Sequence, residues 1–239
     1  MVDVARDGGL AVITIDRPHA RNAIGPATMD ELEKAIDAAA GARALVIRGA
    51  GDRAFVSGGD LKELSAIRTE DEAAAMALRM RQICDQLANF PAPVIAALNG
   101  HALGGGAEVA VAADIRIAAD DIRIGFTQVS LAIVPAWGGA ERLAALVGKG
   151  RALLLAGAGT VLDAAEAYRI GLVDQVLPRA RFEAGWRSVA ESLATDSARE
   201  IKRLTAGAVA PDEAAQAFAR LWVADAHWAA TERVINRGK

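Results

Sequence analysis

The chain of 239 residues is short of three things: cysteine, long apolar runs and clusters of basic residues. Its one cysteine, Cys84, precludes an internal disulfide and fits a reducing cytosol, so we expect a cytoplasmic protein in which Cys84 is a small buried hydrophobe. The longest uncharged stretch, residues 86–107, holds two prolines and four glycines and therefore predicts no membrane-spanning helix. Residues 1–7 show neither the basic nor the apolar region of a secretory signal.

Charge and histidine content exclude two kinds of ligand. The formal net charge is −3 and the basic residues are scattered along the chain, so no nucleic-acid partner is predicted. The histidines, His19, His101 and His227, lack the spacing of a metal site, and we expect no bound metal. A chain of this length forms one large domain, or one domain with an appendage, around an ordinary apolar core.

Hydrophobic patterning predicts strands that alternate with helices over the first two-thirds of the chain. A capping box predicts a helix from Thr28 that ends near Gly41, and a second box at Thr69 predicts a long helix that reaches Asn89. The last 60 residues contain no strand candidate and are expected to be helical. This order is typical of an α/β layer with a helical appendage at its C-terminal end. The predicted strands are residues 10–15, 44–48, 93–98, 115–117, 122–124 and 172–176.

Common nucleotide-binding and nucleophile motifs are incomplete or absent. Residues 49–54 match the pattern G-x-G-x-x-G/A, but residues 55–59 stand between it and any helix that could receive a pyrophosphate, so nicotinamide binding is not favoured. No P-loop sequence occurs, and Ser57 lacks the G-x-S-x-G pattern of a serine hydrolase.

The most informative segment is residues 99–108, in which three consecutive glycines stand between a predicted strand and a predicted helix. Such a triplet can be a plain loop. At a helix N-terminus, however, glycines leave unshielded N–H groups at the positive end of the helix dipole, and a developing oxyanion requires such donors. Glu108 lies three residues after Gly105, where a carboxylate can move a proton at the carbon next to a polarised carbonyl. A second glycine loop, residues 54–62, could supply another N–H to the same oxygen.

These segments together resemble the crotonase family, also called the enoyl-CoA hydratase/isomerase superfamily. The resemblance covers nearly the whole chain and implies an α/β fold in which repeated ββα units form a spiral over residues 1–180. It also implies a C-terminal helical trimerisation region, residues 181–239, that builds a trimer or a dimer of trimers. The segments that carry it are Ile15-Asp16-Arg17-Pro18 with Asn22-Ala23, residues 54–64, Asn99–Glu108 with Ala113-Asp114, Val134-Pro135 with Gly138-Gly139, and Gly171-Leu172-Val173.

The resemblance implies a coenzyme A thioester as substrate, with no separate cofactor because coenzyme A is part of that substrate. The oxyanion-hole N–H groups fall on Gly59 and Gly105, and Glu108 matches the first of the two glutamates that hydratases use. The residues implied to contact the substrate or its coenzyme A moiety are Arg21, Asn22, Ala23, Ser57, Asp60, Leu61 and Trp137.

One position departs from the hydratase pattern. Seven residues before Pro135, hydratases have their second glutamate, and this chain has Gln128, which only orients other groups by hydrogen bonds. Relatives that decarboxylate methylmalonyl- or ethylmalonyl-CoA also lack that second acid, and the Pro135-Ala136-Trp137 run resembles the ethylmalonyl-CoA type.

Three reactions at a thioester enolate therefore stay open. In a hydratase, Gln128 would help Glu108 to hold the attacking water. In an isomerase, Glu108 would be the single proton shuttle, and in a decarboxylase it would orient the substrate carboxylate or protonate the enolate. Hydration is our first choice because it is the commonest assignment for chains with this overall pattern.

A different class of protein, a non-catalytic oligomer that binds acyl-CoA, also fits the pattern. In that case Glu108 would be a solvated glutamate stabilised by a helix N-terminus. The surrounding glycines favour catalysis instead. Apolar residues near the C-terminal end predict self-association, because the helices there otherwise lack a partner for Phe218, Leu221, Trp222 and Val223.

Overall fold

The structure is a computed structural model that describes residues 1–207 and 209–237. Its larger sheet has six strands in the spatial order β1-β2-β3-β5-β7-β10. All neighbours in this sheet are parallel except β1 and β2, which pair antiparallel. The strands are β1 (Val2–Asp7), β2 (Leu10–Ile15), β3 (Ala44–Gly49), β5 (Val94–Leu98), β7 (Ile115–Ala119) and β10 (Gln175–Leu177).

The smaller sheet has four short strands in the order β4-β6-β8-β9. β4, β6 and β8 run parallel to one another, and β9 closes the sheet antiparallel to β8. The strands are β4 (Ala54–Val56), β6 (His101–Leu103), β8 (Arg123–Gly125) and β9 (Val161–Asp163).

The chain visits the two sheets in turn. β3 is followed by β4, β5 by β6 and β7 by β8, and each pair leads into helical structure before the next pair begins. This repetition confirms the expected spiral of ββα units. Successive turns of the spiral place α2 (Leu61–Leu64) and α3 (Glu70–Ala88) after β4, α4 (Gly105–Ala112) after β6, and the 3-10 turn η2 (Gln128–Leu131) and α5 (Gly139–Val147) after β8.

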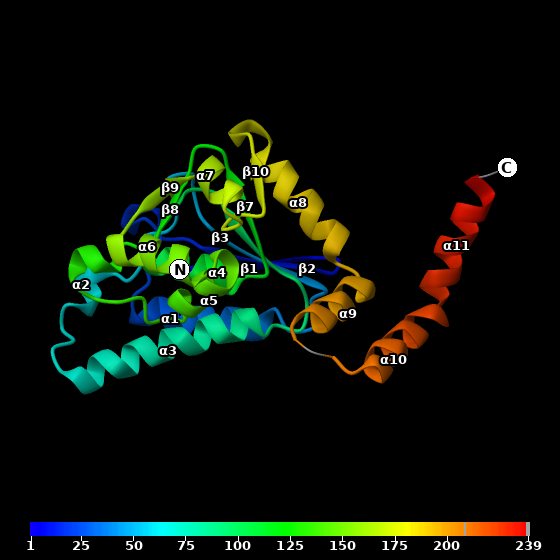
Figure 1. The fold of residues 1–239 in the computed structure, drawn as a ribbon, viewed down its shortest axis with the longest axis horizontal. Coiled ribbons are helices and arrows are strands. Elements are labelled where there is room, and N and C mark those ends of the chain that lie inside the picture. Colours follow the sequence, from blue (N-terminus) through cyan, green and yellow to red (C-terminus); the bar gives the residue numbers. More distant parts are fainter. Residues whose placement is uncertain (208, 238–239) are drawn as a thin grey trace.

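Helices cover the larger sheet, and this explains why its central strands are apolar on both faces. α1 (Pro26–Ala38) and α3 lie side by side (Figure 1), and α8 (Phe182–Leu193) packs on β3 and β7.

Cys84 on α3 is fully buried, as expected, and burial raises the pKa of its thiol to about 12. The remaining elements of the body are the 3-10 turns η1 (Pro18–Ala20) and η3 (Arg179–Arg181) and the helices α6 (Lys149–Ala158), α7 (Ala164–Arg169) and α9 (Asp196–Thr205).

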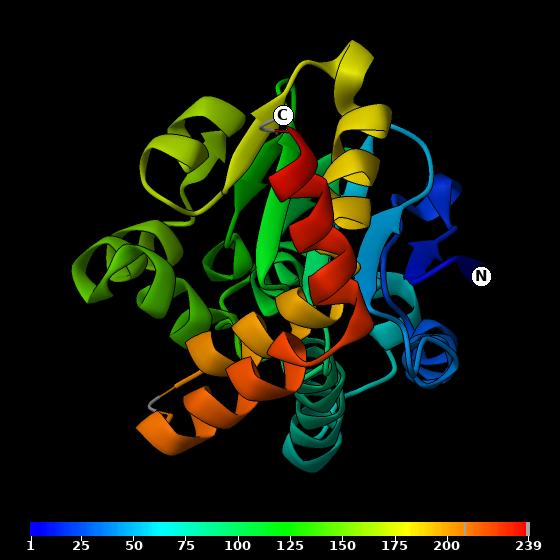
Figure 2. The ribbon, with the colours of Figure 1, turned by 90° about the vertical axis from the view of Figure 1, so that its right-hand side faces the viewer.

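The chain ends in two helices that lead away from this body. α10 (Pro211–Trp222) and α11 (Asp225–Arg237) extend to one side in Figure 1, and the view of Figure 2 brings them to the front. None of the described helices combines the length and the apolar content that crossing a membrane requires.

Two sequence predictions about element ends are wrong. Thr28 caps no helix: α1 begins at Pro26, two residues earlier, because proline is pre-organised for the first helical position, and Thr28 is buried where its hydroxyl accepts a hydrogen bond from Arg17. The late strand begins at Gln175 rather than at residue 172, since the N–H groups of residues 172 and 173 both donate to Ala167 at the end of α7. The capping box at Thr69 is confirmed.

Candidate active site

The predicted catalytic residues meet at one edge of the smaller sheet. β4, β6 and β8 are parallel neighbours, so their carboxyl ends lie side by side. Gly59 follows β4, Gly105 and Glu108 follow β6, and Gln128 follows β8. All four residues line one cavity of about 380 Å³.

The backbone N–H of Gly59 is left unpaired by the way its loop is held. Ile24 forms a parallel bridge with Gly59, in which Ile24 N–H donates to the Gly58 carbonyl at 2.9 Å and Asp60 N–H donates to the Ile24 carbonyl at 2.8 Å. This bridge uses the residues on either side of Gly59. Within the described chain no acceptor takes the Gly59 N–H.

A second unpaired N–H belongs to Gly105, the first residue of α4. Donors in the first turn of a helix have no intrahelical acceptor, and none of the described residues supplies another one. Gly58 has a φ of +106°, and a Cβ built on it would lie 3.3 Å from the Gly105 nitrogen. Glycine at position 58 therefore lets the two loops approach closely. Two N–H donors at one cavity can bind a carbonyl oxygen that gains negative charge.

Trp137 forms the wall beside both donors. A Cβ on Gly105 would lie 2.2 Å from Cζ3 of the indole, and one on Gly59 would lie 3.9 Å from Cζ2. The indole is buried and lines the cavity.

Glu108 is an almost fully buried carboxylate, with 2% of its surface exposed. Its Oε2 accepts hydrogen bonds from the N–H groups of Trp137 at 2.7 Å and Gly139 at 2.9 Å, and its Oε1 accepts one from Nε2 of Gln128 at 2.8 Å. Burial raises the pKa of Glu108 above its ordinary value, and hydrogen bonds from the backbone and from Gln128 offset only part of that rise. A buried carboxyl group with a raised pKa is suited to exchanging protons near neutral pH.

Apart from the hydroxyl side chains of Ser57 and Thr127, the rest of the cavity wall is apolar. It comes from one face of the α2–α3 region and from the segment that follows η2, and it includes no lysine, arginine or histidine among the described residues. Such a wall fits a hydrocarbon chain and offers no counter-charge to a second carboxylate. The apolar lining residues are Leu61, Leu64, Ala73, Met76, Ala77, Leu131, Ile133, Val134 and Ala136.

A second hollow adjoins the cavity on the outside and shares Ser57, Gly59 and Leu61 with it. It brings together most of the residues implied to contact coenzyme A. The members of that set that line it are Arg21, Ala23, Ser57, Asp60 and Leu61.

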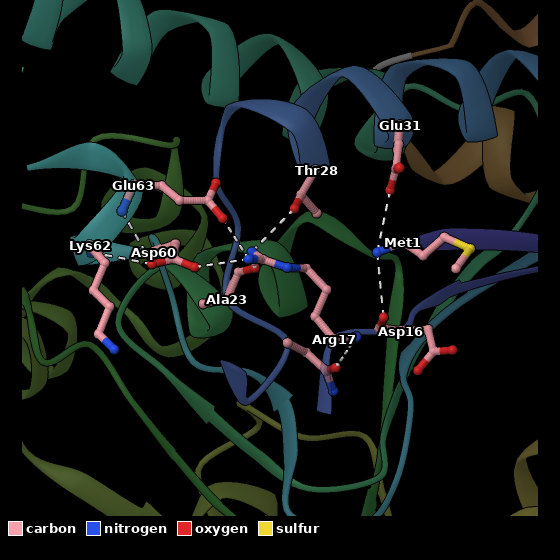
Figure 3. A network of polar contacts seen from close by, with 10 residues as sticks. Met1, Asp16, Arg17, Ala23, Thr28, Glu31, Asp60, Lys62 and Glu63 are labelled. Carbon is pink, nitrogen blue, oxygen red and sulfur yellow. Dashed lines mark hydrogen bonds and ion pairs between the residues drawn. The ribbon is translucent and has the colours of Figure 1, made fainter. Parts of the chain in front are cut away.

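Arg17 holds the wall of this outer hollow, and sequence reasoning did not single it out. Its Nη2 lies 3.0 Å from Asp60 and 2.6 Å from Glu63, and its Nη1 donates to the Ala23 carbonyl at 2.6 Å (Figure 3). Arg17 therefore ties the segment before α1 to the loop that carries Gly59. The signal in the sequence that could have identified Arg17 is its position in the segment Ile15-Asp16-Arg17-Pro18, which carries part of the family resemblance.

Asn22 does not reach the outer hollow, contrary to its implied role. Its side chain is fully buried: Nδ2 donates to the carbonyls of Ala50 and Ala54, and Oδ1 accepts from the N–H of Arg17. The Asn22 side chain thus makes its hydrogen bonds to main-chain groups, which would otherwise be buried without partners. Asn22 is thus a structural residue under the site.

Two unpaired N–H groups and a buried carboxyl group thus lie around one cavity, an arrangement typical of an enzyme site. The chain belongs to the enoyl-CoA hydratase/isomerase family, whose sequence profile matches residues 5–227. This confirms the resemblance seen in the sequence.

Individual relatives agree with that assignment. The chain is 35% identical over 204 residues to the short-chain-enoyl-CoA hydratase of Clostridium acetobutylicum, in an alignment that covers 84% of this chain and 78% of that protein. It is 41% identical over 174 residues to the crotonyl-CoA hydratase of Syntrophomonas wolfei, covering 70% of this chain and 65% of that protein. The solved enoyl-CoA hydratase of Bacillus anthracis matches with a TM-score of 0.83 at 32% identity, covering 92% of this chain and 89% of that one.

The structural role of Asn22 predicts a loss of stability on its removal. Asn22→Ala should lower the free energy of unfolding by about 2 kcal/mol more than Arg21→Ala, because it leaves buried main-chain groups without partners. Arg21 is a matched control, since it is exposed and has the same left-handed backbone as Asn22 (φ +53° against +56°). Urea denaturation measures both variants. Equal losses in the two variants would show that the Asn22 side chain carries no such role.

Proposed function

We propose that this chain is an enoyl-CoA hydratase, which adds water across the C2–C3 double bond of a 2-enoyl-CoA. The observation that carries the proposal is that the Gly59 and Gly105 N–H groups and the Glu108 carboxyl group line one cavity. The names of the relatives in Clostridium and Syntrophomonas point the same way.

The two N–H groups activate the thioester. They donate to its carbonyl oxygen, which becomes an enolate oxygen when water attacks C3 and the double-bond electrons move toward C1. One such donor typically contributes on the order of 3 kcal/mol to the transition state. Glu108 takes the proton that the attacking water loses, because its carboxyl group is the titratable side chain of the cavity.

The coenzyme A moiety occupies the outer hollow, along Arg21, Ala23 and the backbone of residues 57–61. Arg21 is exposed there, and Lys62 adds a second positive charge toward an anionic ligand. Arg17 pairs with Asp60 and Glu63, so these two carboxylates repel phosphate less than unpaired ones would. Trp137 packs beside the thioester.

Isomerisation is the second candidate, and decarboxylation has less support. A single carboxyl group suffices to move a proton between two carbons of an acyl chain, which is the step that isomerisation requires. A malonyl-type substrate would instead bring its own carboxylate next to Glu108, in a cavity lined by no cationic residue of the described chain. A non-catalytic binder would have no use for a buried carboxyl group with a raised pKa.

We also propose that α10 and α11 assemble copies of the chain into a trimer or a dimer of trimers. Large apolar side chains on α10 and in the turn after it are exposed: Phe218 is 62% and Val223 73% exposed, and Trp222 stacks between Phe218 and His227. An apolar surface of this kind is typical of an interface.

The buried free thiol of Cys84 fits a reducing compartment, and we propose a cytoplasmic location for the protein.

Replacement of the catalytic carboxyl group tests the reaction. Glu108→Gln should slow the hydration of crotonyl-CoA on the order of 100-fold to 10,000-fold, followed as loss of the absorbance of the conjugated thioester. Binding of butyryl-CoA, measured by calorimetry, should persist. Glu191→Gln on the exposed side of α8 is the matched control and should keep full activity.

The pH dependence of the wild type follows from the same group. A base works in its ionised form, so activity is present above the pKa of Glu108 and is lost as the pH falls through it. Because burial raises this pKa, the acid limb of kcat/KM should lie above the ordinary range of a glutamate. Cys84 on α3, whose pKa is about 12, stays neutral throughout. An acid limb at the ordinary value would contradict the assignment.

A pair of substitutions at Gly105 tests the oxyanion donor. Gly105→Pro removes the N–H, whereas Gly105→Ala keeps it, and both add a Cβ that crowds the Trp137 indole. The proline variant should therefore lose about 100-fold more in kcat than the alanine variant. Equal kcat values in the two variants would rule out this N–H as a donor to the substrate.

The oligomer is tested by light scattering. The wild type should have the mass of three or six chains, and Val223→Glu should shift it toward the monomer because a charge then enters an apolar interface. Leu78→Glu, at another apolar and exposed position, on α3, is the control and should leave the mass unchanged. A wild-type mass of one chain would contradict the proposed assembly.

A further inference from the structure

One side-chain atom of Gln128, the amide oxygen Oε1, is buried without a hydrogen-bond partner among the described residues. Its side chain is 6% exposed and lies at the start of η2, where Nε2 donates to Glu108 Oε1 at 2.8 Å. The other end of the amide, Oε1, is buried and accepts no hydrogen bond from the protein. Across the described residues it is the one buried side-chain polar atom in this condition.

The orientation of this amide is determined by Glu108. An ionised carboxylate accepts hydrogen bonds and repels a carbonyl oxygen, so the NH2 group of Gln128 must face it. Glu108 Oε2 already has two N–H donors, and this leaves Oε1 as the carboxylate oxygen with capacity for a further one. A buried carbonyl oxygen without a donor costs about 1–3 kcal/mol, so the position of Gln128 Oε1 calls for a donor that the protein itself does not supply.

We propose that Gln128 Oε1 and Glu108 Oε1 together hold the water that adds to C3, and that Glu108 alone carries a proton from this water to C2. The inference rests on the proposed hydratase function and assigns what replaces the second glutamate. Glu108 and Gln128 line the same cavity, and two acceptor oxygens match the two hydrogens of a water molecule, which leaves the oxygen lone pair directed away from both.

The chemistry balances with this single carboxyl group. The water oxygen forms a bond to C3, the C2–C3 π electrons move to give the enolate, and one O–H bond of the water breaks as its proton goes to Glu108. The enolate then collapses, C2 takes that proton, and Glu108 returns to its ionised form. Gln128 neither gains nor loses a proton, because an amide does not titrate in this range.

One consequence concerns stereochemistry. Because one carboxyl group both receives and returns the proton, hydrogen and hydroxyl are added to the same face of the double bond. Hydration of crotonyl-CoA in D2O should therefore give one diastereomer of 3-hydroxybutyryl-CoA deuterated at C2, which proton NMR identifies by the coupling between C2 and C3. Addition to opposite faces would overturn the single-carboxyl route.

Substitution of Gln128 tests the water-holding role against a merely structural one. Gln128→Met keeps the length of the side chain but removes both its acceptor and its donor. Its effect is measured on two reactions: hydration of crotonyl-CoA, which needs the held water, and exchange of the C2 hydrogens of butyryl-CoA with D2O, which needs only Glu108 and the oxyanion donors. Hydration should fall about 100-fold more than exchange, because only hydration loses its positioned nucleophile.

Gln128→Glu is the conservative counterpart. It keeps an acceptor oxygen at the same place, so hydration should recover to within about tenfold of the wild type at the pH where the two carboxyl groups share one proton. The wild type should show one acid limb in its pH profile. The variant should show a second ionisation, since two carboxyl groups within hydrogen-bond distance titrate as a coupled pair.

The outcomes separate this inference from the function on which it rests. A wild type that exchanges the C2 hydrogens but does not hydrate crotonyl-CoA would overturn the proposed hydratase, and the held water with it. A wild type that hydrates, together with a Gln128→Met variant that hydrates equally well, would overturn the role of Gln128 alone. Equal losses of hydration and exchange in Gln128→Met would show that Gln128 only braces Glu108.

Discussion

The burial of the Glu108 carboxyl group is the constraint on which the site depends. An ionised carboxylate without partners would cost several kcal/mol in this environment, so the fold must bring donors to it. Those donors come from Trp137, Gly139 and Gln128, which belong to the segments that form the cavity wall. The same hydrogen bonds therefore keep the carboxyl group ionisable and hold the wall in place around the substrate.

The spiral of ββα units supplies the geometry for this arrangement. Three successive turns deliver β4, β6 and β8 to the smaller sheet, and the segments that follow these strands bring the candidate functional groups to a common edge. The separation of the Gly59 and Gly105 donors is thus set by the pairing of β4 with β6 and by the bridge between Ile24 and Gly59. Arg17 adds a lateral tie through Asp60, whose own N–H completes that bridge.

The sequence allowed five of the six strands of the larger sheet to be predicted, all except β1, but only β8 of the sheet on which the candidate site is built. β2, β3 and β5 are apolar runs of five or six residues, long enough to be recognised. β4 and β6 have three residues each and adjoin glycine-containing turns, so no periodicity reveals them. Gly59, Gly105 and Glu108 were found through their glycine motifs. The buried role of Asn22 was not, because its hydrogen bonds join loops about 30 residues apart in the sequence.

The burial of Glu108 in this cavity also limits which reactions the site can support. Glu108 is the one carboxyl group among the described residues that line the cavity, and a single carboxyl group can accept only one proton at a time. In the proposed hydration, both proton transfers then pass through Glu108 in sequence. Such a route requires the water to be oriented by a group that does not compete for the proton. An amide meets this requirement better than a second carboxylate, because its oxygen accepts a hydrogen bond without becoming basic and its NH2 group stabilises the ionised form of Glu108.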